Sequence, residues 1–299
     1  MEEIVIVIKS FYNDISRAAR LMKSIAEFNV DEIPVHLIIP EKDKDSFVES
    51  LGTGTYELHL DEEILKKVMA CTTSTIADTS GGVLQQIIKS EFWRLGLAEN
   101  YLIIDSDSYF IKDFSVSDFM FRNGIPYTIM NEGGHQREWA ARAGDRRFLR
   151  DYCETRDRGK ELFKRTGPYF DFAPTPVIFS SKVMEALFET VAKPKGISFF
   201  DQIVQFPCET QWYGEFLLKD LTIPIIPREP LFKVWGFKSQ WEEGQVLGET
   251  DDVLKENFLG VVDQSYWSRE LDALSFKEKR AIKWERRIRR WKRWLYRRT

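Results

Sequence analysis

Tyr101-Leu-Ile-Ile-Asp-Ser-Asp-Ser-Tyr-Phe110 is the stretch that decides the fold, because an apolar run ends there in two acids one residue apart. Such a run is typical of a buried parallel strand, and open α/β sheets bind ligands at the carboxyl ends of their strands. The carboxylates of Asp105 and Asp107 would repel each other unless positive charge lay between them. Mg²⁺ commonly supplies that charge and fills its shell with substrate phosphates. The stretch therefore predicts a metal site at Asp105 and Asp107 and points toward nucleotide chemistry.

The two acids have different expected roles. Asp107 is the more direct metal ligand, while Asp105 contacts a ribose or reaches the metal through water. The competing interpretation is that a strand-terminal Asp caps the following turn through its side chain. The apolar residues before Asp105 favour the metal site, because they place both acids at the carboxyl edge of the sheet.

Strand and helix patterns alternate along the chain and predict an α/β fold with a mostly parallel central sheet flanked by helices. The early strands are expected at 4–8, 35–39 and 56–60, and the helices between and after them at 14–28, 43–51 and 83–98. Later helices are expected at 137–165 (in two pieces), 182–192 and 209–220, with strands at 126–130 and 175–180, a strand edge or loop at 224–230, and a mobile segment at 236–250. The simplest partition is a catalytic domain over 1–275 and a C-terminal helix over 276–299.

Composition narrows the class of protein. The 299 residues are 43% hydrophobic, which is enough for a sizeable core. The three cysteines form no CxxC pair, so we expect a reducing compartment and neither a zinc ribbon nor a disulfide framework. The N-terminus runs straight into an apolar strand and reads as neither a signal peptide nor a membrane span.

Charge is divided unevenly between the body and the tail. The net charge is −4, but residues 277–299 alone carry +10 and the rest −14. Within the tail, apolar residues recur every three or four positions and form one stripe surrounded by arginine and lysine: Ala281, Trp284, Ile288, Trp291 and Leu295. A basic amphipathic helix containing Trp is typical of an interfacial anchor, so we expect an anionic membrane surface as its partner. A nucleic-acid arm and a helix packed on the body are the alternatives, and we expect no nucleic-acid partner.

Two further polar groups precede the acidic strand. Lys9, Ser10 and Asp14 lie where the first strand meets the first helix, the corner that holds the nucleotide in doubly wound sheets. Gln86 and Lys89 lie on a helix just before the acidic strand, and the lysine could contact a pyrophosphate. Ordinary helix capping and a solvated helix face are the alternatives. The chain contains neither GxGxxG nor a Walker lysine motif, which disfavours dinucleotide enzymes and P-loop NTPases.

The remaining candidate site residues are two possible catalytic bases and the histidines. Glu209, beside aromatic residues, is the first candidate for a base and Asp201 the second. A helix N-terminal Glu favoured by the dipole is the alternative for Glu209. The histidines are too scattered in sequence for a metal motif, and His36 and His59 read as structural residues of strands.

Four segments in this order resemble a GT-A-type glycosyltransferase, and more closely a bacterial family of uncharacterised proteins, expected to be glycosyltransferases, that carry a DxD signature. The segments are Lys9-Ser-Phe-Tyr-Asn-Asp14, Gly81-Gly-Val-Leu-Gln-Gln-Ile-Ile-Lys89, Ile104-Asp-Ser-Asp-Ser-Tyr-Phe110 and Glu209-Thr-Gln-Trp-Tyr-Gly214. The resemblance implies a GT-A (Rossmann-like) fold, a nucleotide-sugar donor, Mn²⁺ or Mg²⁺ at Asp105 and Asp107, and Glu209 in the acceptor half. One departure concerns the metal, since many GT-A enzymes use a late His as a ligand and this chain has none after His135.

The resulting hypothesis is a metal-dependent glycosyltransferase that moves a sugar from a nucleotide sugar to a glycan or lipid-linked glycan during assembly of a bacterial surface polysaccharide. The tail would hold it in the cytoplasm, peripheral at the inner face of the cytoplasmic membrane. The alternatives are a nucleotide-binding or membrane-scaffold protein without turnover, and a metal-dependent nucleotidyltransferase or phosphatase.

Overall fold

The computed structural model describes residues 1–69, 79–173 and 175–264. The predicted amphipathic helix at 276–299 lies outside this range and stays a prediction. None of the described helices is long and apolar enough to cross a membrane.

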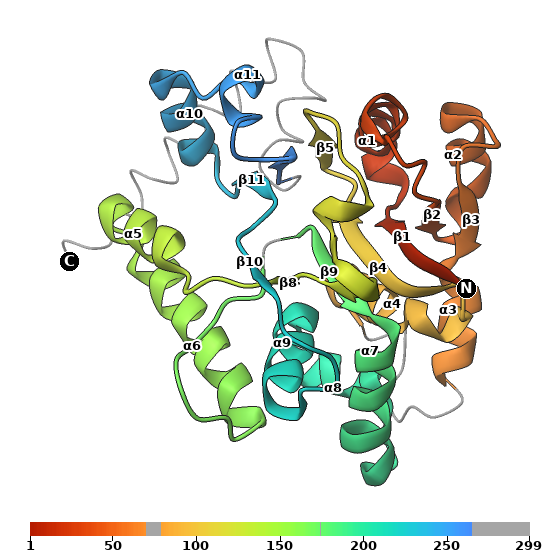
Figure 1. Cartoon of the computed structure of the whole chain (residues 1–299), viewed down its shortest axis with the longest axis vertical. Coiled ribbons are helices and arrows are strands. Elements are labelled where there is room, and N and C mark those ends of the chain that lie inside the picture. Colours follow the sequence, from red (N-terminus) through yellow and green to blue (C-terminus); the bar gives the residue numbers. More distant parts are fainter. Residues whose placement is uncertain (70–78, 174, 265–299) are drawn as a thin grey trace, which may run out of the picture.

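A five-stranded sheet forms the centre of the molecule and confirms the predicted α/β class (Figure 1). Its order is β3-β2-β1-β4-β9, with the first four strands parallel and β9 antiparallel to β4. The strands are β1 (Glu2–Lys9), β2 (Val35–Ile39), β3 (Glu57–Leu60), β4 (Ala98–Asp105) and β9 (Val177–Ser180). The side chains of β1 from Ile4 to Ile8 are buried, as expected for strands covered on both faces.

Strand register places two of the predicted site residues side by side. Lys9, the last residue of β1, lies opposite Asp105, the last residue of β4. Because both strands run the same way, their carboxyl ends meet at one edge of the sheet. The first strand-to-helix corner, which the sequence predicts to hold the nucleotide, therefore lies beside the acid pair.

Helices cover both faces of the sheet in the way that right-handed crossovers require. α1 (Ile15–Phe28) and α2 (Lys44–Leu51) lie together on one face, and the chain then returns across the other face through α3 (Asp61–Met69) and α4 (Gly81–Glu91) (Figure 1). α7 (Ser181–Leu187), α8 (Phe199–Gln205) and α9 (Glu209–Asp220) complete the second layer. The helical period of α1 buries Ala18, Leu21, Met22 and Ile25.

The second half of the chain adds helices and short strands around this core. The predicted two-piece helix is confirmed as α5 (Gly134–Ala143) and α6 (Arg146–Leu162). The predicted strand at 126–130 is divided into β7 (Ile125–Pro126), which pairs with β6 (Met120–Phe121), and β8 (Thr128–Ile129), which pairs with β10 (Pro227–Arg228). Single-turn 3-10 segments join several elements, among them Tyr12–Asp14, Glu41–Asp43 and Phe92–Leu95, and a π-helical turn at Phe188–Ala192 follows α7.

The segment 236–250, expected to be mobile from its polar composition, contains regular structure. α10 (Lys238–Leu247) occupies it and α11 (Asp251–Leu254) follows. The helix forms because Gln240 accepts hydrogen bonds from the backbone N–H groups of Gly236 and Phe237, and because the missing side chain of Gly244 makes room for the Trp235 ring. These contacts stabilise a helix in a segment whose polar composition alone suggests a loop.

A small second sheet explains the position of the acid pair. β5 (Ser108–Phe110) follows Asp107 directly and pairs antiparallel with β12 (Gly260–Asp263), which in turn pairs with β11 (Phe232–Trp235). The pairing brings the end of the described chain back to the strand edge, where the Asp263 N–H donates to the Asp107 carbonyl over 2.9 Å. Asp105 and Asp107 thus lie at the junction of two sheets.

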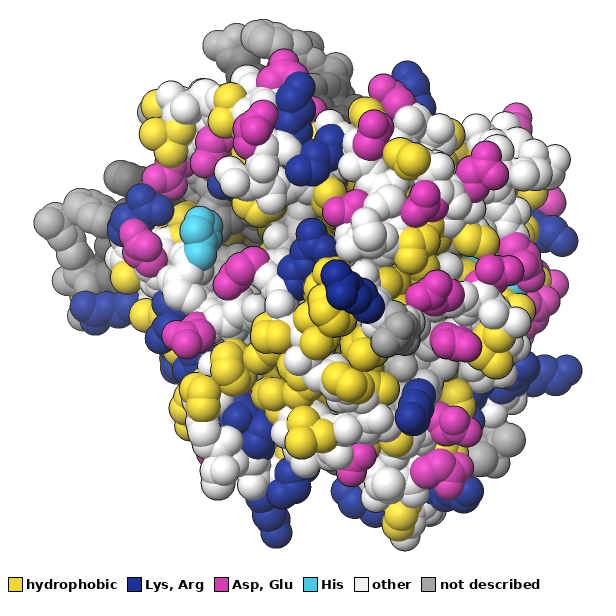
Figure 2. All heavy atoms as spheres, viewed as in Figure 1, with side chains coloured by type: hydrophobic (Ala, Val, Ile, Leu, Met, Phe, Trp, Pro, Cys, Tyr) yellow, Lys and Arg dark blue, Asp and Glu magenta, His cyan; other side chains and the backbone are white. Residues whose placement is uncertain are grey.

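Surface charge on the face shown in Figure 2 is mixed. Acidic and basic side chains are interspersed there, and hydrophobic side chains gather over the lower half of the view. No concentration of positive charge like that of the tail sequence is visible on this face of the described residues.

Candidate active site

A cavity of about 810 Å³ lies at the carboxyl edge of the central sheet. Acidic and basic side chains line it together with the first turn of α4. The charged lining residues are Lys9, Asp14, Lys42, Asp43, Asp61, Asp105 and Asp107. Its volume falls within the range usual for small-molecule and cofactor sites, about 300–1,000 Å³.

Asp105 is held in a fixed orientation by two partners. One carboxylate oxygen accepts a hydrogen bond from Lys89 Nζ at 3.0 Å, and the other accepts from Thr175 Oγ1 at 2.7 Å. Burial alone would raise the pKa of Asp105, but the Lys89 ammonium and the Thr175 hydroxyl together lower it below its usual value. Asp105 is therefore ionised at neutral pH and presents a rigid carboxylate to the cavity.

Lys89 connects Asp105 to Glu209. Its Nζ lies 3.1 Å from Glu209 Oε1, and its side chain is only 3% exposed. Burial would lower the pKa of Lys89, but the two carboxylates outweigh that effect and raise it. Lys89, predicted to contact a pyrophosphate, does not line the cavity. The buried carboxylates hold it behind the acid pair, because separating them from their cation in the protein interior would be costly.

Glu209 lies at the start of α9, where the sequence placed it, and it is buried. It is not among the residues that line the cavity and reaches the acid pair through Lys89. Residues distant in sequence thus form one buried line of charge that runs from Asp105 through Lys89 to Glu209.

Lys9 and Asp61 form a second buried ion pair in the wall of the cavity. Lys9 Nζ lies 3.0 Å from Asp61 Oδ1 and donates to the Ser10 carbonyl at 2.7 Å. Burial lowers the pKa of Lys9 and raises that of Asp61 to about 6, although the attraction within the pair opposes both shifts. The pair therefore places at the cavity a lysine that already has a carboxylate partner.

Sequence reasoning missed Asp61, although the necessary signal was present. Asp61 directly follows β3, so the rule that selected the acids after β4 also applies to it. Asp43 is a similar omission after β2, and its carboxylate accepts a hydrogen bond from the Tyr12 backbone N–H. Further acids lie beside both positions, Glu62 and Glu63 after Asp61 and Glu41 two residues before Asp43, so the strand-end rule could have selected them from the sequence.

The remaining predicted residues divide between the cavity and its surroundings. Asp14 lines the cavity and lies 3.6 Å from Arg17. Ser10 is buried beside it, and Gln86, one residue after the lining Gln85, does not line the cavity. The Asp201 carboxylate accepts hydrogen bonds from the N–H and the hydroxyl of Ser198 and so caps the start of its own helix, α8.

Arg20 contacts the backbone of Asp107 and the residues around it. Its guanidinium lies 2.9 Å from Asp263 and donates to the Asp107 carbonyl at 3.4 Å, and it stacks 4.3 Å above the Tyr109 ring. Nothing in the local sequence indicates this contact, because Arg20 and Asp263 are 243 positions apart.

Hard oxygen ligands are what Mg²⁺ and Mn²⁺ prefer, and the acid pair supplies them. Asp107 lines the cavity. Each Asp105 oxygen holds one hydrogen bond, and a carboxylate has about four lone-pair sites, so acceptor capacity remains. The residues present therefore fit a hard divalent cation.

Comparison with known proteins gives one family and a distant structural likeness. No curated protein sequence matches this chain. The crystal structure of mouse xyloside xylosyltransferase 1 in its apo form is similar over 88% of this chain and 98% of that chain, with 8% identical residues and a TM-score of 0.45. Residues 3–243 match a family whose description assigns no activity, and the chain therefore belongs to DUF6492, a family of unknown function.

Proposed function

We propose that this protein is a metal-dependent glycosyltransferase that moves a sugar from a nucleotide-sugar donor to a glycan or lipid-linked glycan acceptor. One observation carries the proposal, namely the pair Asp105 and Asp107 at the carboxyl edge of a parallel sheet, on a cavity large enough for a nucleotide. In open α/β sheets this edge is where ligands bind.

The donor's diphosphate would lie between the acid pair and Lys9. Asp107 is the proposed ligand of Mn²⁺ or Mg²⁺, with Asp105 contributing through water or contacting the ribose. When bound, the cation would neutralise charge on the departing nucleoside diphosphate. Lys9 would add positive charge from the neighbouring strand end, and Asp14, which also lines the cavity, would contact the nucleotide. Ser10 and Gln86 do not line the cavity, so we propose no contact for them.

Lys89 has a positioning role in this proposal. By holding Asp105 through one hydrogen bond and Glu209 through an ion pair, it fixes the distance between donor and acceptor halves. If transfer inverts the configuration, Glu209 is the proposed base for the acceptor hydroxyl. Asp201 is the second candidate, and it is weaker because its carboxylate caps α8.

The C-terminal segment supplies the proposed location. Its basic, Trp-containing pattern suits the inner face of the cytoplasmic membrane, where lipid-linked acceptors for a surface polysaccharide would be reached. This part of the proposal rests on the sequence of residues 277–299 alone.

A thermal-shift screen of nucleotide sugars with and without Mn²⁺ tests the proposal, since a ligand that binds only the folded protein raises its melting temperature. Asp107→Ala should remove the Mn²⁺-dependent part of the shift, while Asp113→Ala, which changes an exposed acid on the same segment, should leave it intact. If a nucleotide sugar shifts the wild type and Asp107→Ala equally, with and without a chelator, the metal assignment is wrong.

The reaction product separates the alternatives. Sugar transfer releases a nucleoside diphosphate, whereas a nucleotidyltransferase releases pyrophosphate and a phosphatase releases phosphate. A protein that binds the donor but forms none of these products with any acceptor would be a nucleotide-binding or scaffold protein.

A further inference from the structure

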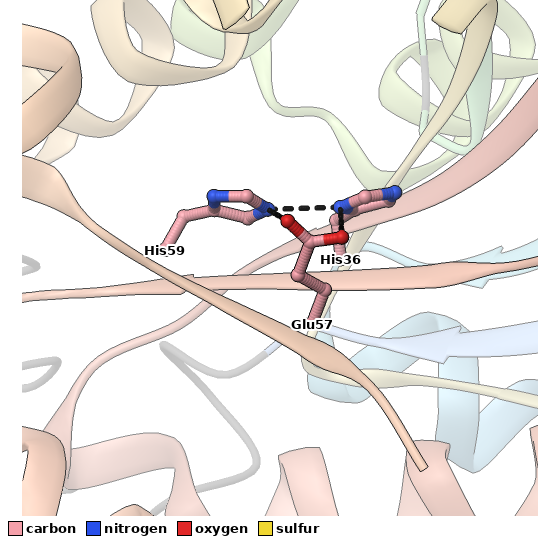
Figure 3. Close-up of side chains that lie close together, drawn as sticks. All are labelled: His36, Glu57 and His59. Atoms are coloured by element: carbon pink, nitrogen blue, oxygen red, sulfur yellow. Dashed lines mark hydrogen bonds and ion pairs between the residues drawn. The ribbon is translucent and has the colours of Figure 1, made fainter. Parts of the chain in front are cut away.

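Two histidines and a glutamate meet on one face of the sheet, outside the lining of the cavity (Figure 3). His36 comes from β2, and Glu57 and His59 come from β3. His36 pairs in register with Glu57, and Glu57 and His59 are two residues apart, so all three side chains share a face. His36 and His59, expected to be structural and too scattered for a metal motif, therefore lie together with an acid in a group that could hold an ion.

One ligand atom from each of the three side chains lies within 4.8 Å of the others, which is near the spacing of a metal site. His36 Nδ1 lies 2.8 Å from His59 Nε2, and the two Glu57 oxygens lie 3.7 Å and 3.6 Å from these respective nitrogens (Figure 3). A tetrahedral zinc ion with bonds of about 2.0–2.1 Å separates its ligand atoms by about 3.3 Å. The observed distances lie on both sides of that value, so shifts of a few tenths of an ångström would complete the geometry.

The surroundings hold the rings in place. Both histidines are buried, and their rings stack with centroids 5.1 Å apart while Phe92 meets each of them edge-on. Glu57 lies on the outer side with 59% of its side chain exposed. A cation could therefore enter from solvent beside Glu57 and keep a fourth position open for water or another ligand.

We propose that His36, Glu57 and His59 bind a borderline divalent cation of the Zn²⁺ class, at a site different from the acid pair of the cavity. Imidazole nitrogens favour Zn²⁺ over Mg²⁺, which prefers oxygen ligands. Because β3 is the edge strand of the sheet, the bound ion would fasten that strand to β2.

The protonation state of the rings suits this site. Burial, followed by the charge of its neighbour His59, lowers the pKa of His36 to about 4, against an opposing effect of Glu57. Burial also lowers the pKa of His59, with Glu57 and Glu63 opposing the shift. Both rings are thus neutral at pH 7, as metal ligation requires. One ring must move its proton to its other nitrogen for both facing nitrogens to bind, so uptake of the ion releases no net proton from the histidines.

The test is a Zn²⁺ titration of the full chain after treatment with a chelator, by calorimetry in buffers of different ionisation enthalpy. With excess Mg²⁺ present to occupy the acid pair, we expect one equivalent of Zn²⁺ bound by the wild type, with a higher melting temperature. Glu57→Gln and His59→Asn remove direct ligands, so each should weaken binding by at least the roughly tenfold that loss of an outer-shell partner costs. His135→Asn, which changes an exposed histidine elsewhere, and Asp107→Asn should bind as the wild type does. Mg²⁺ should not compete.

Two results would overturn the proposal. One is a wild type that takes up no Zn²⁺, and the other is uptake that Glu57→Gln leaves unchanged. Glu57 is largely exposed, so Glu57→Gln should fold. It therefore tests the proposal even if His59→Asn fails to fold. Loss of Zn²⁺ in Asp107→Asn alone would assign the ion to the acid pair instead, and would leave the proposed glycosyltransferase site standing.

Discussion

Replacing Lys89 by Met removes the cation that contacts both Asp105 and Glu209, and leaves the buried carboxylate of Glu209 and the partly buried carboxylate of Asp105 without it. At 3.0 Å and 3.1 Å, and with an effective dielectric constant of about 20, each attraction is worth about 5 kcal/mol before the cost of burying the charges is subtracted. Measured losses on breaking a buried ion pair are about 3–5 kcal/mol. We therefore expect Lys89→Met to lose about 3–5 kcal/mol of unfolding free energy at pH 7.

The loss should depend on pH. In the wild type, the lowered pKa of Asp105 stabilises the fold above the ordinary aspartate pKa, and this stabilisation is lost as pH falls through the lowered value. The raised pKa of Lys89 stabilises the fold below the ordinary lysine pKa and is lost at higher pH. Between about pH 5 and 9 both contributions are present.

In Lys89→Met, burial of Asp105 is no longer opposed by the ammonium, so the pKa of Asp105 rises. A carboxyl with a raised pKa in the folded state loses stability as pH increases. The difference in unfolding free energy from the wild type should therefore be smaller at pH 5 than at pH 8, because protonation of Asp105 relieves the uncompensated charge.

Urea unfolding followed by circular dichroism, with a chelator present, measures these free energies. Lys182→Met is the control, since it makes the same change at an exposed lysine of α7 and should cost no more than about 0.5 kcal/mol. If Lys89→Met loses as little as Lys182→Met, or if its loss is independent of pH, the line of charge from Asp105 to Glu209 does not stabilise the fold as described.

Three further predictions concern packing, reactivity and the tail. Gly214→Ala should lose about 1–3 kcal/mol in urea unfolding, because its Cβ would lie 2.1 Å from the Phe172 ring, whereas Gly82→Ala meets nothing within 4 Å and should be neutral or slightly stabilising; equal losses would contradict this packing. Burial and, to a smaller extent, the neighbouring carboxylate of Glu209 raise the pKa of the Cys208 thiol to about 12. Iodoacetamide at pH 8 should therefore label Cys208 only after unfolding. Rapid labelling of the folded protein, detected by peptide mass spectrometry, would refute this. Deleting 277–299 should abolish co-sedimentation with anionic vesicles, and a truncated protein that still sediments would exclude the tail as the anchor.

Much of the fold could be predicted because its signals are local. The apolar runs of β1 and β4 and the helical period of α1 are periodic over a few residues, and burial of one face follows directly from such a period. The start of α9 at Glu209 could be predicted for the same reason. The position of the acid pair is equally local, since a strand that ends at Asp105 must present the residues after it at the sheet edge.

The errors arose where contacts between distant residues decide the structure. The α10 segment looks mobile from its polar composition, but Trp235 packs against the space left by Gly244. His36 and His59 are 23 positions apart, and only the pairing of β2 with β3 makes them neighbours. The periodicity of apolar residues contains no information on which strands pair, so it could not predict these contacts.

The sequence by itself determined the alternation of strands and helices and the position of two carboxylates at a strand end, because both follow from the spacing of apolar and polar residues along a short length of chain. Only the tertiary structure decided that Lys89 joins Asp105 to Glu209, that Asp61 pairs with Lys9 in the cavity wall, and that the end of the described chain returns to Asp107. The physical reason is that a buried charge takes as its partner whichever opposite charge the folded backbone brings within about 3 Å, and strand order, not sequence distance, sets that choice.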